Sequence, residues 1–173
     1  MTNSVLLVDD DAAVREALGQ TLELAGLQPI LASSFISARD HISPAFEGVV
    51  VSDIRMQGKD GFALLAFAQE IDVDLPVVLL TGEGDVRMAV RSMSAGAFDF
   101  LEKPCDPKHF TEVVEKALKT RALVLENRRL KAQLDQAQHE KIGFLGVSSA
   151  AKRLREAIRR ASRVATPVLI CGE

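Results

Sequence analysis

The stretch Ser4-Val5-Leu6-Leu7-Val8-Asp9-Asp10-Asp11 joins a short apolar run to three consecutive acids near the start of the chain. An apolar run of this length, bounded by polar residues, predicts a strand that is buried on both faces of a sheet. In an open α/β sheet, ligands bind beyond the carboxyl ends of the strands. This one stretch therefore predicts both the kind of sheet and the edge of the sheet that carries the chemistry.

Four more apolar runs follow, and segments with helical spacing of apolar residues separate them. The predicted strands are Val5–Val8, Pro29–Ala32, Val49–Ser52, Val77–Leu80 and Phe98–Leu101. The predicted helices are Ala12–Ala25, Ile36–Ile42, Phe62–Glu70, Val86–Ser94 and a fifth that begins near Asp106. Strands joined by helices of this size predict an α/β fold, a doubly wound five-stranded parallel sheet over residues 1–118.

Length and charge indicate that the chain has more than one part. Its 173 residues, 47% hydrophobic and 26% charged, suit one domain with a remainder and exclude both a disordered chain and a single large enzyme. Residues 1–110 contain 17 acids and 8 bases, whereas residues 111–173 contain 7 acids and 13 bases. We therefore expect two segments with different roles.

The cysteines and the lengths of the apolar runs bear on the compartment. Cys105 and Cys171 are far apart, which predicts neither a disulfide framework nor a thiolate metal site and fits a reducing cytosol. No apolar run approaches the roughly 18–20 residues that a membrane span needs. We expect a cytoplasmic protein that makes no membrane contact.

A long helix is predicted from Lys108 to about Gln138, because this segment lacks glycine and proline and is rich in strong helix formers. Its heptad pattern places Val113, Thr120, Asn127 and Leu134 at a positions and Lys116, Leu123, Leu130 and Ala137 at d positions. The pattern predicts a dimerising coiled-coil linker over residues 119–140. The alternative is a solvated helix whose first turns pack on the sheet and whose remainder only links domains.

The last segment, residues 141–173, is predicted to be the beginning of a second domain. Gly143 and Gly146 interrupt the helix, and Ser148 or Ser149 then caps a basic amphipathic helix over Ala151–Val164. Thr166–Cys171 is predicted to be a buried strand. One helix and one strand do not enclose a core, so we expect this segment to be truncated.

Carboxylates follow two strands that are predicted to be neighbours. Asp9 and Asp10 follow the first strand and Asp53 ends the third, and these strands adjoin in the flavodoxin-like order 2-1-3-4-5. Clustered carboxylates with room for water suit Mg²⁺. Helix capping is the other interpretation of these acids, and it is the one we favour for Asp11.

Two further polar residues are predicted to lie at the same edge. Thr81 ends the fourth strand, and Lys103 follows the fifth strand, before Pro104. A hydroxyl donor and an ammonium group beside a magnesium site indicate a site that handles a phosphoryl group. A cis bond before Pro104 would aim the lysine inward.

Together, these motifs resemble the receiver domain of bacterial two-component response regulators. The motifs that carry the resemblance are Val8-Asp9-Asp10-Asp11, Ser52-Asp53-Ile54-Arg55-Met56 with Asp60-Gly61, Thr81-Gly82 and Lys103-Pro104. The resemblance implies that Asp53 accepts a phosphoryl group from the histidine of a sensor kinase. It also implies that Asp10, Asp53 and the main-chain carbonyl of Arg55 bind Mg²⁺, and that Asp9 reaches the ion through water.

The same resemblance implies roles around the phosphoryl group. Thr81 would sense this group, Lys103 would pair with it, and Phe100 occupies the position of the aromatic switch. Arg55 and Glu83 would flank the mouth of the site and modulate the lifetime of the acyl phosphate. Gln57 stands where the family usually has proline, and we expect this difference to loosen the loop.

The carboxy-terminal segment resembles the start of the AAA+ domain of NtrC-type sigma-54-dependent activators. This second resemblance rests on Phe144-Leu145-Gly146, the Lys152–Ala161 helix and Val168-Leu169-Ile170-Cys171-Gly172-Glu173. The lysine and the Ser/Thr of the phosphate-binding loop are absent, so we expect no ATPase activity. The receiver segment and the linker most resemble regulators of four-carbon dicarboxylate transport.

The expected function is therefore a phosphorylation-controlled switch rather than an enzyme, with only self-phosphorylation and self-dephosphorylation chemistry. The resemblance implies a homodimer through the fourth helix, the fifth strand and the linker helix. Sigma-54 RNA polymerase and DNA would be partners of the full-length protein alone. The alternatives are a magnesium-dependent phosphohydrolase with an aspartate nucleophile and a flavodoxin-like electron carrier. We expect no direct DNA binding by the basic tail.

Overall fold

A computed structural model describes residues 3–82, 86–141 and 147–161 of the chain. Two compact units are present, Met1–Glu126 and Asn127–Glu173. The strands are β1 (Ser4–Val8), β2 (Gln28–Ala32), β3 (Val49–Asp53), β4 (Val77–Gly82) and β5 (Asp99–Lys103). The helices are α1 (Ala12–Leu24), α2 (Phe35–Arg39), α3 (Gly61–Ile71), α4 (Val86–Ser94), α5 (Pro107–Lys141) and α6 (Ser149–Ala161).

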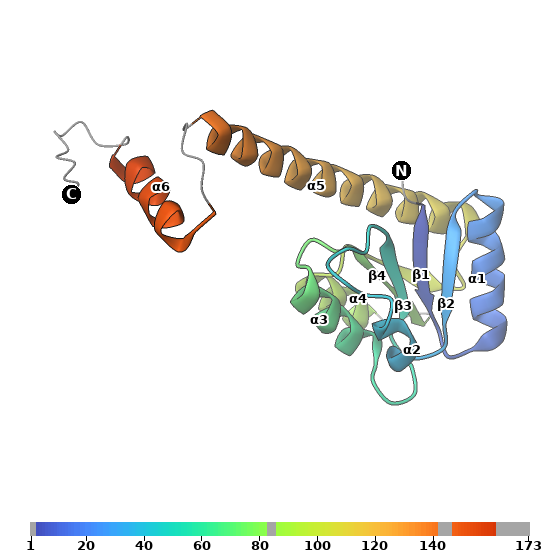
Figure 1. The fold of residues 1–173 in the computed structure, drawn as a ribbon. Helices are drawn as coiled ribbons and strands as arrows, with labels where there is room; N and C mark the ends of the chain where they lie inside the picture. Colours follow the sequence, from blue (N-terminus) through green and yellow to red (C-terminus); the bar gives the residue numbers. More distant parts are fainter. Residues whose placement is uncertain (1–2, 83–85, 142–146, 162–173) are drawn as a thin grey trace, which may run out of the picture. The chain divides into compact units, whose positions relative to one another are not determined.

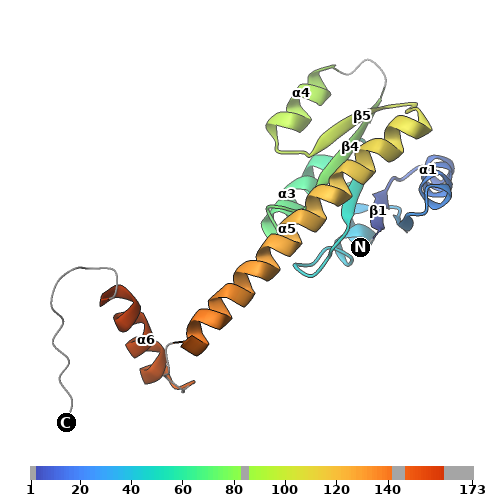
Figure 2. The same ribbon diagram turned by 90° about the horizontal axis from the view of Figure 1, so that it is seen from above.

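The first unit is a five-stranded parallel sheet in the order β2-β1-β3-β4-β5, as predicted (Figure 1). Helices α1 and α5 cover one face of the sheet, and α2, α3 and α4 cover the other (Figures 1 and 2). Because β1 lies between β2 and β3, the winding direction reverses at β1 and β3. Their carboxyl ends therefore border the crevice in which such sheets bind ligands.

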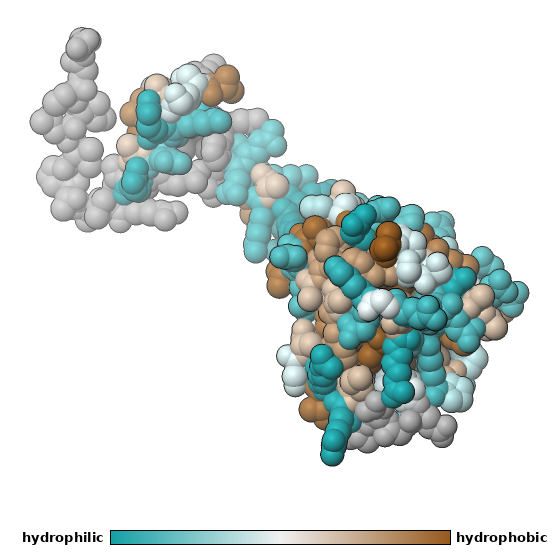
Figure 3. Space-filling model, turned by 90° about the horizontal axis from the view of Figure 1, so that it is seen from below, coloured by the Kyte–Doolittle hydropathy of each residue, from teal (hydrophilic) through white to brown (hydrophobic). Residues whose placement is uncertain are grey.

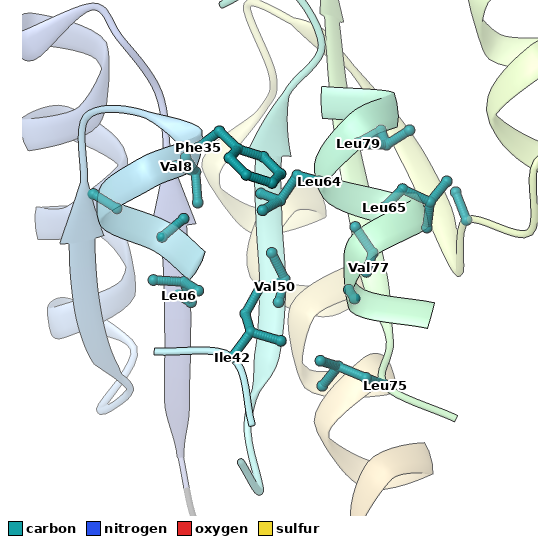
Figure 4. Close-up of a cluster of buried hydrophobic side chains, with 14 of the residues drawn as sticks. Leu6, Val8, Phe35, Ile42, Val50, Leu64, Leu65, Leu75, Val77 and Leu79 are labelled. Carbon is teal, nitrogen blue, oxygen red and sulfur yellow. The ribbon is translucent and has the colours of Figure 1, made fainter. Parts of the chain in front are cut away.

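Each face of the sheet has its own hydrophobic core, because successive side chains of a strand point to opposite faces. From β1, Leu6 and Val8 pack toward α2 and α3, where they meet Phe35 and Leu64 (Figure 4). The alternate residues of the sheet pack against α1 and α5. This second cluster includes Val5, Leu7, Val51, Leu80, Phe110 and Val114. The two cores hold the strands in place, and the polar loops follow the carboxyl ends of these strands.

Strands β4 and β5 both end later than predicted. The fourth strand continues to Gly82, and the fifth runs from Asp99 to Lys103 rather than from Phe98 to Leu101. Main-chain pairing continues past the apolar residues, with Thr81 opposite Glu102 and Gly82 opposite Lys103. The polar side chains mark the end of each apolar run, but Thr81 is still buried and the backbone pairing ends later.

Helix α5 begins in the core of the first unit, where Phe110, Val113 and Ala117 are buried. Val113, an a position of the predicted heptads, thus packs on the sheet rather than on an exposed seam. Further along the helix, Leu123, Leu130 and Leu134 are exposed, so a seam would begin after the buried turns. The division into residues 1–118, 119–140 and 141–173 stays a prediction.

In the second unit, Ser148 caps α6, as predicted: its Oγ accepts a hydrogen bond from Ala151 N at 3.2 Å. Gly143, Gly146 and the Phe144-Leu145-Gly146 motif lie outside the described residues, as do the predicted strand Thr166–Cys171 and the end of the chain. Within the described ranges, no helix has both the length and the apolar character needed to cross a membrane.

Arg121, on α5, forms a buried contact that the sequence analysis did not predict. Its side chain is fully buried, and Nη1 lies 2.8 Å from Asp72 Oδ2, just after α3. Nη2 donates to the main-chain oxygen of Phe46 at 2.7 Å, in the loop before β3. Nε has no hydrogen-bond partner among the residues that the structure describes. The guanidinium group thus fastens α5 to two loops at the amino-terminal edge of the sheet.

Removing the cation of this buried pair should destabilise the first unit. We expect Arg121→Met to lower the free energy of unfolding by about 3–5 kcal/mol, because Asp72 would remain buried after losing the guanidinium group that pairs with it. Urea denaturation measures the change. Lys119→Met removes an exposed ion pair with Glu115 on the same helix and should cost less than about 1 kcal/mol. Equal losses for the two variants would contradict this account.

Candidate functional site

The candidate site lies at the carboxyl ends of β1 and β3. Asp9 and Asp10 follow β1 and Asp53 ends β3, and carboxylate oxygens of the three residues lie within 4.8 Å of one another. Figure 3 shows the molecule from this side, where hydrophilic residues surround smaller hydrophobic patches. The structure brings together the three carboxylates that the sequence analysis predicted.

Asp9 is almost completely buried, with 1% of its surface exposed. Its Oδ1 accepts the main-chain N–H of Asp11 at 2.9 Å, and its Oδ2 accepts Lys103 Nζ at 2.6 Å. Its main-chain oxygen accepts Arg15 Nη1 at 2.6 Å. Asp9 is thus fixed by three different groups of the chain, two of them cationic.

Asp11 has the capping role that we predicted for it. Its side chain accepts the main-chain N–H groups of Ala13 and Val14, at 2.9 and 3.2 Å, at the start of α1. It is absent from the cluster of carboxylates within 4.8 Å. The three consecutive acids therefore divide between a helix cap and the site.

Lys103 reaches the cluster from the end of β5. Its Nζ lies 2.6 Å from Asp9 Oδ2 and 2.9 Å from Asp53 Oδ1, and the peptide bond to Pro104 is cis. Burial lowers the pKa of Lys103, but the hydrogen bonds that Lys103 donates to Asp9 and Asp53, together with the negative charges of these two residues, outweigh burial. The pKa of Lys103 therefore lies above its ordinary value of 10.5, and the ammonium form is held at neutral pH.

Asp53 is buried next to this lysine, with 7% of its surface exposed. Burial raises its pKa most, Lys103 lowers it, and the charges of Asp9 and Asp10 raise it further. The net result is a pKa above the ordinary value of 3.8. The carboxylate at the centre of the site is therefore less stable in its charged form than an exposed aspartate, and an added cation would favour it.

The donor atoms of the cluster fit a hard divalent cation. All three side chains offer carboxylate oxygens, the ligands that Mg²⁺ prefers. Asp10 is exposed, so water has access to complete the coordination. These carboxylates are the residues of the site that could hold a metal ion.

The other predicted site residues surround the cluster. Thr81 is buried at the end of β4, and its Oγ1 lies 3.5 Å from the main-chain oxygen of Gly82. Phe100 is half-buried on β5, three residues before Lys103, and Arg55 is exposed in the loop after β3. Glu83 lies outside the described residues.

Sequence reasoning missed the role of the main chain at Gln57. Its N–H donates to Asp10 Oδ2 at 2.9 Å, although the two residues are 47 positions apart. We expected the missing proline to loosen this loop, but the position makes a contact with the site that proline cannot make. The absence of proline at this position was the available signal.

Glycine at position 61 is required by close packing beside the cluster. A Cβ atom there would lie 2.4 Å from the main-chain oxygen of Asp53, and real Cβ contacts are essentially never so short. The main-chain N–H of Gly61 donates to Ile54 O at 3.0 Å, which closes the loop of residues 54–61. The Asp60-Gly61 pair thus positions the loop, and Asp60 caps α3.

Comparison with known proteins relates this geometry to a family. The family model described as response regulator receiver domain matches residues 5–115. The chain is 46% identical over 170 residues to the C4-dicarboxylate transport transcriptional regulatory protein DctD of Pseudomonas aeruginosa. It is 40% identical over 173 residues to the DctD protein of Rhizobium meliloti. Both alignments cover 98% of this chain but only 37% of the relative, so the chain spans little more than a third of their length.

A solved structure gives the same result. The solution structure of the beryllofluoride-activated NtrC4 receiver domain dimer superposes with a TM-score of 0.64 at 33% identity. The match covers 69% of this chain and 98% of the NtrC4 chain. Sequence and fold therefore agree over the unit that contains the carboxylate cluster.

The raised pKa of Asp53 predicts a pH-dependent effect on stability. We expect Asp53→Asn to raise the melting temperature of the metal-free protein at pH 7, because the amide avoids burying a charge. The folded protein binds the Asp53 proton more tightly than the unfolded chain, so the contribution of Asp53 to wild-type stability falls as pH rises from 3.8 through the raised pKa. The advantage of Asp53→Asn should therefore grow over this range.

Thermal unfolding in a chelator, followed from pH 3.5 to 7, measures the difference. The control is Asp40→Asn, at an exposed aspartate, which should show no such trend. An advantage of Asp53→Asn that shrinks as pH rises would contradict the burial argument.

Proposed function

The chain belongs to the family of response regulator receiver domains, and we propose that Asp53 accepts a phosphoryl group from a histidine of a sensor kinase. One observation carries this proposal: Lys103 bridges Asp9 and Asp53 within a cluster of carboxylates at the ligand-binding edge of the sheet. A nucleophilic carboxylate needs a neighbouring positive charge so that an anionic group can approach it. Lys103 supplies this charge.

The proposed reaction is nucleophilic substitution at phosphorus. An oxygen of Asp53 forms the new P–O bond while the P–N bond to the kinase imidazole breaks, and the imidazole keeps the electron pair and takes up a proton. Phosphoryl transfer has a loose transition state, so positioning and charge supply most of the catalysis. Lys103 Nζ, 2.9 Å from Asp53 Oδ1, is positioned to pair with the phosphoryl oxygens. Hydrolysis of the acyl phosphate returns Asp53 to a carboxylate.

Asp10, Asp53 and the main-chain oxygen of Arg55 would hold Mg²⁺, with Asp9 reaching it through water. The contacts of Asp9 support this indirect role, because both of its side-chain oxygens already accept hydrogen bonds. When bound, the ion supplies positive charge to the phosphoryl oxygens. Asp10 and Asp53 hold their carboxylates on adjacent strand ends, which orients them before the ion arrives.

Thr81 and Phe100 are the proposed switch residues. The Thr81 hydroxyl would donate a hydrogen bond to the phosphoryl group, and Phe100 would turn inward into the space that Thr81 leaves. The half-buried state of Phe100 supports this role, because the ring has both core and solvent within reach. Arg55 and Glu83 would modulate the lifetime of the acyl phosphate.

The proposed output is a change in a homodimer. Helix α4 exposes Val90 and Met93, which supports an interface through α4, β5 and the linker part of α5. In a chain that also carried the AAA+ domain, this change would control a sigma-54-activating ATPase and hence transcription, with RNA polymerase and DNA as partners. The similarity to both DctD proteins supports a role in the regulation of dicarboxylate transport. The proposed location of this regulator is the cytoplasm.

A magnesium-dependent phosphohydrolase with an aspartate nucleophile is not favoured. The family model that matches the chain describes a receiver domain of response regulators. Multiple turnover of a phosphomonoester by the purified chain would be needed to support that alternative. No observation favours the flavodoxin-like electron carrier.

Phosphoacceptance is tested by intact mass spectrometry after treatment with acetyl phosphate and Mg²⁺. We expect wild type to gain one phosphoryl group and Asp53→Asn to gain none, because the amide is not a nucleophile. Asp40→Asn, at an exposed position, is the control and should be modified like wild type. Equal modification of Asp53→Asn would contradict the assignment of the acceptor.

The linker interface is tested by sedimentation. Leu130 is exposed and is a d position of the heptads, so Leu130→Lys should raise the dimer dissociation constant about tenfold or more, equivalent to about 1.4 kcal/mol. Ala132→Lys introduces the same charge at an f position and should have little effect. Equal sedimentation of both variants would argue against a coiled-coil seam.

A further inference from the structure

A main-chain hydrogen bond joins the two loops that carry the proposed metal ligands. Gln57 N–H, in the loop after β3, donates to Oδ2 of Asp10, in the loop after β1, at 2.9 Å. Arg55, whose carbonyl is a proposed ligand, lies two residues before Gln57 on the same loop. The bond therefore connects two proposed ligands through a short piece of backbone.

The loop that carries Gln57 is anchored on both sides of this residue. At its start, Ile54 N–H donates to Leu80 O at 2.9 Å, and at its end Gly61 N–H donates to Ile54 O at 3.0 Å. Lys59 Nζ lies 4.4 Å from the centre of the Phe35 ring, on α2. With both sides held, the N–H of Gln57 has a defined position relative to the site.

The carboxylate of Asp10 needs such a contact more than its neighbours do. Asp9 and Asp53 both contact Lys103, whereas Asp10 is exposed and belongs to a cluster of like charges. Repulsion from those charges favours rotation of Asp10 away from the cluster. A hydrogen bond from N–H to a carboxylate opposes this rotation and occupies one oxygen, Oδ2, which leaves Oδ1 for a cation.

We propose that Gln57 is a positioning residue for the cation site: its main-chain N–H holds Asp10 oriented for Mg²⁺ before the ion binds. This inference rests on the proposed function, because it assumes that the cluster binds Mg²⁺. The side chain of Gln57 has no part in it. Proline, which the family usually has here, lacks the N–H and makes no such bond.

Magnesium titrations of wild type, Gln57→Pro and Gln57→Ala test the role. Gln57→Pro removes the donor and should weaken Mg²⁺ binding by about three- to tenfold, as expected for one hydrogen bond to a charged group near solvent. Gln57→Ala keeps the N–H and should bind within about twofold of wild type. Equal Mg²⁺ affinity of Gln57→Pro and wild type, with both folded by circular dichroism, would overturn the proposal.

An NMR measurement tests the bond itself and does not depend on the proline variant folding. The Gln57 amide should exchange slowly with solvent in wild type and rapidly in Asp10→Ala. It should remain protected when Mg²⁺ is saturating, because Oδ2 keeps its partner while Oδ1 binds the ion. Loss of protection on adding Mg²⁺ would show that the bond competes with the cation, which would overturn the positioning role.

The Asp10→Asn variant separates this inference from the proposed function. Weaker Mg²⁺ binding by Asp10→Asn together with unchanged binding by Gln57→Pro would refute only the role of Gln57. Absence of Mg²⁺ binding by wild type would instead refute the proposed metal site, and this inference with it.

Discussion

The crowding of carboxylates at the ends of β1 and β3 is the constraint on which the rest of the site depends. The strand order makes β1 and β3 neighbours, so residues that directly follow them share a small volume. Lys103 relieves part of the repulsion between Asp9 and Asp53. The relief is incomplete, since the pKa of Asp53 remains raised. The negative charge of the three carboxylates is only partly balanced by Lys103. Such a site is suited to bind a cation and, with the cation, an anionic group.

The fold was predictable because its main signals are local. Short apolar runs alternate with helical segments, and each run proved to be a strand whose alternate residues enter the two cores. The site was predictable for a related reason. Asp9, Asp10, Asp53 and Lys103 all follow strands, and parallel strands bring their carboxyl ends to one edge of the sheet. Strand ends were less predictable, since main-chain pairing of Thr81 and Gly82 leaves no trace in side-chain polarity.

The contacts that the sequence did not predict depend on three-dimensional positions without a local signal. Arg121 lies in a basic, helix-forming segment, and its sequence surroundings do not distinguish it from the other arginines of that segment. Only the packing of α5 brings it to Asp72, 49 residues away. Gln57 acts through its main chain, so its residue type mattered only by not being proline. Such contacts join segments that are far apart in the sequence, and the spacing of apolar residues within each segment does not predict them.

The Arg121–Asp72 pair also has a consequence for dividing the chain into pieces. The family model ends at residue 115, and the sequence pattern suggested an end near residue 118. A fragment cut at either point would keep the whole carboxylate cluster and Lys103, yet it would lack Arg121. Asp72 and the carbonyl of Phe46 would then lose their hydrogen bonds from the guanidinium group. A fragment that keeps this contact therefore extends past the boundary of the motif, to at least Arg121, within the segment that we assigned to the linker.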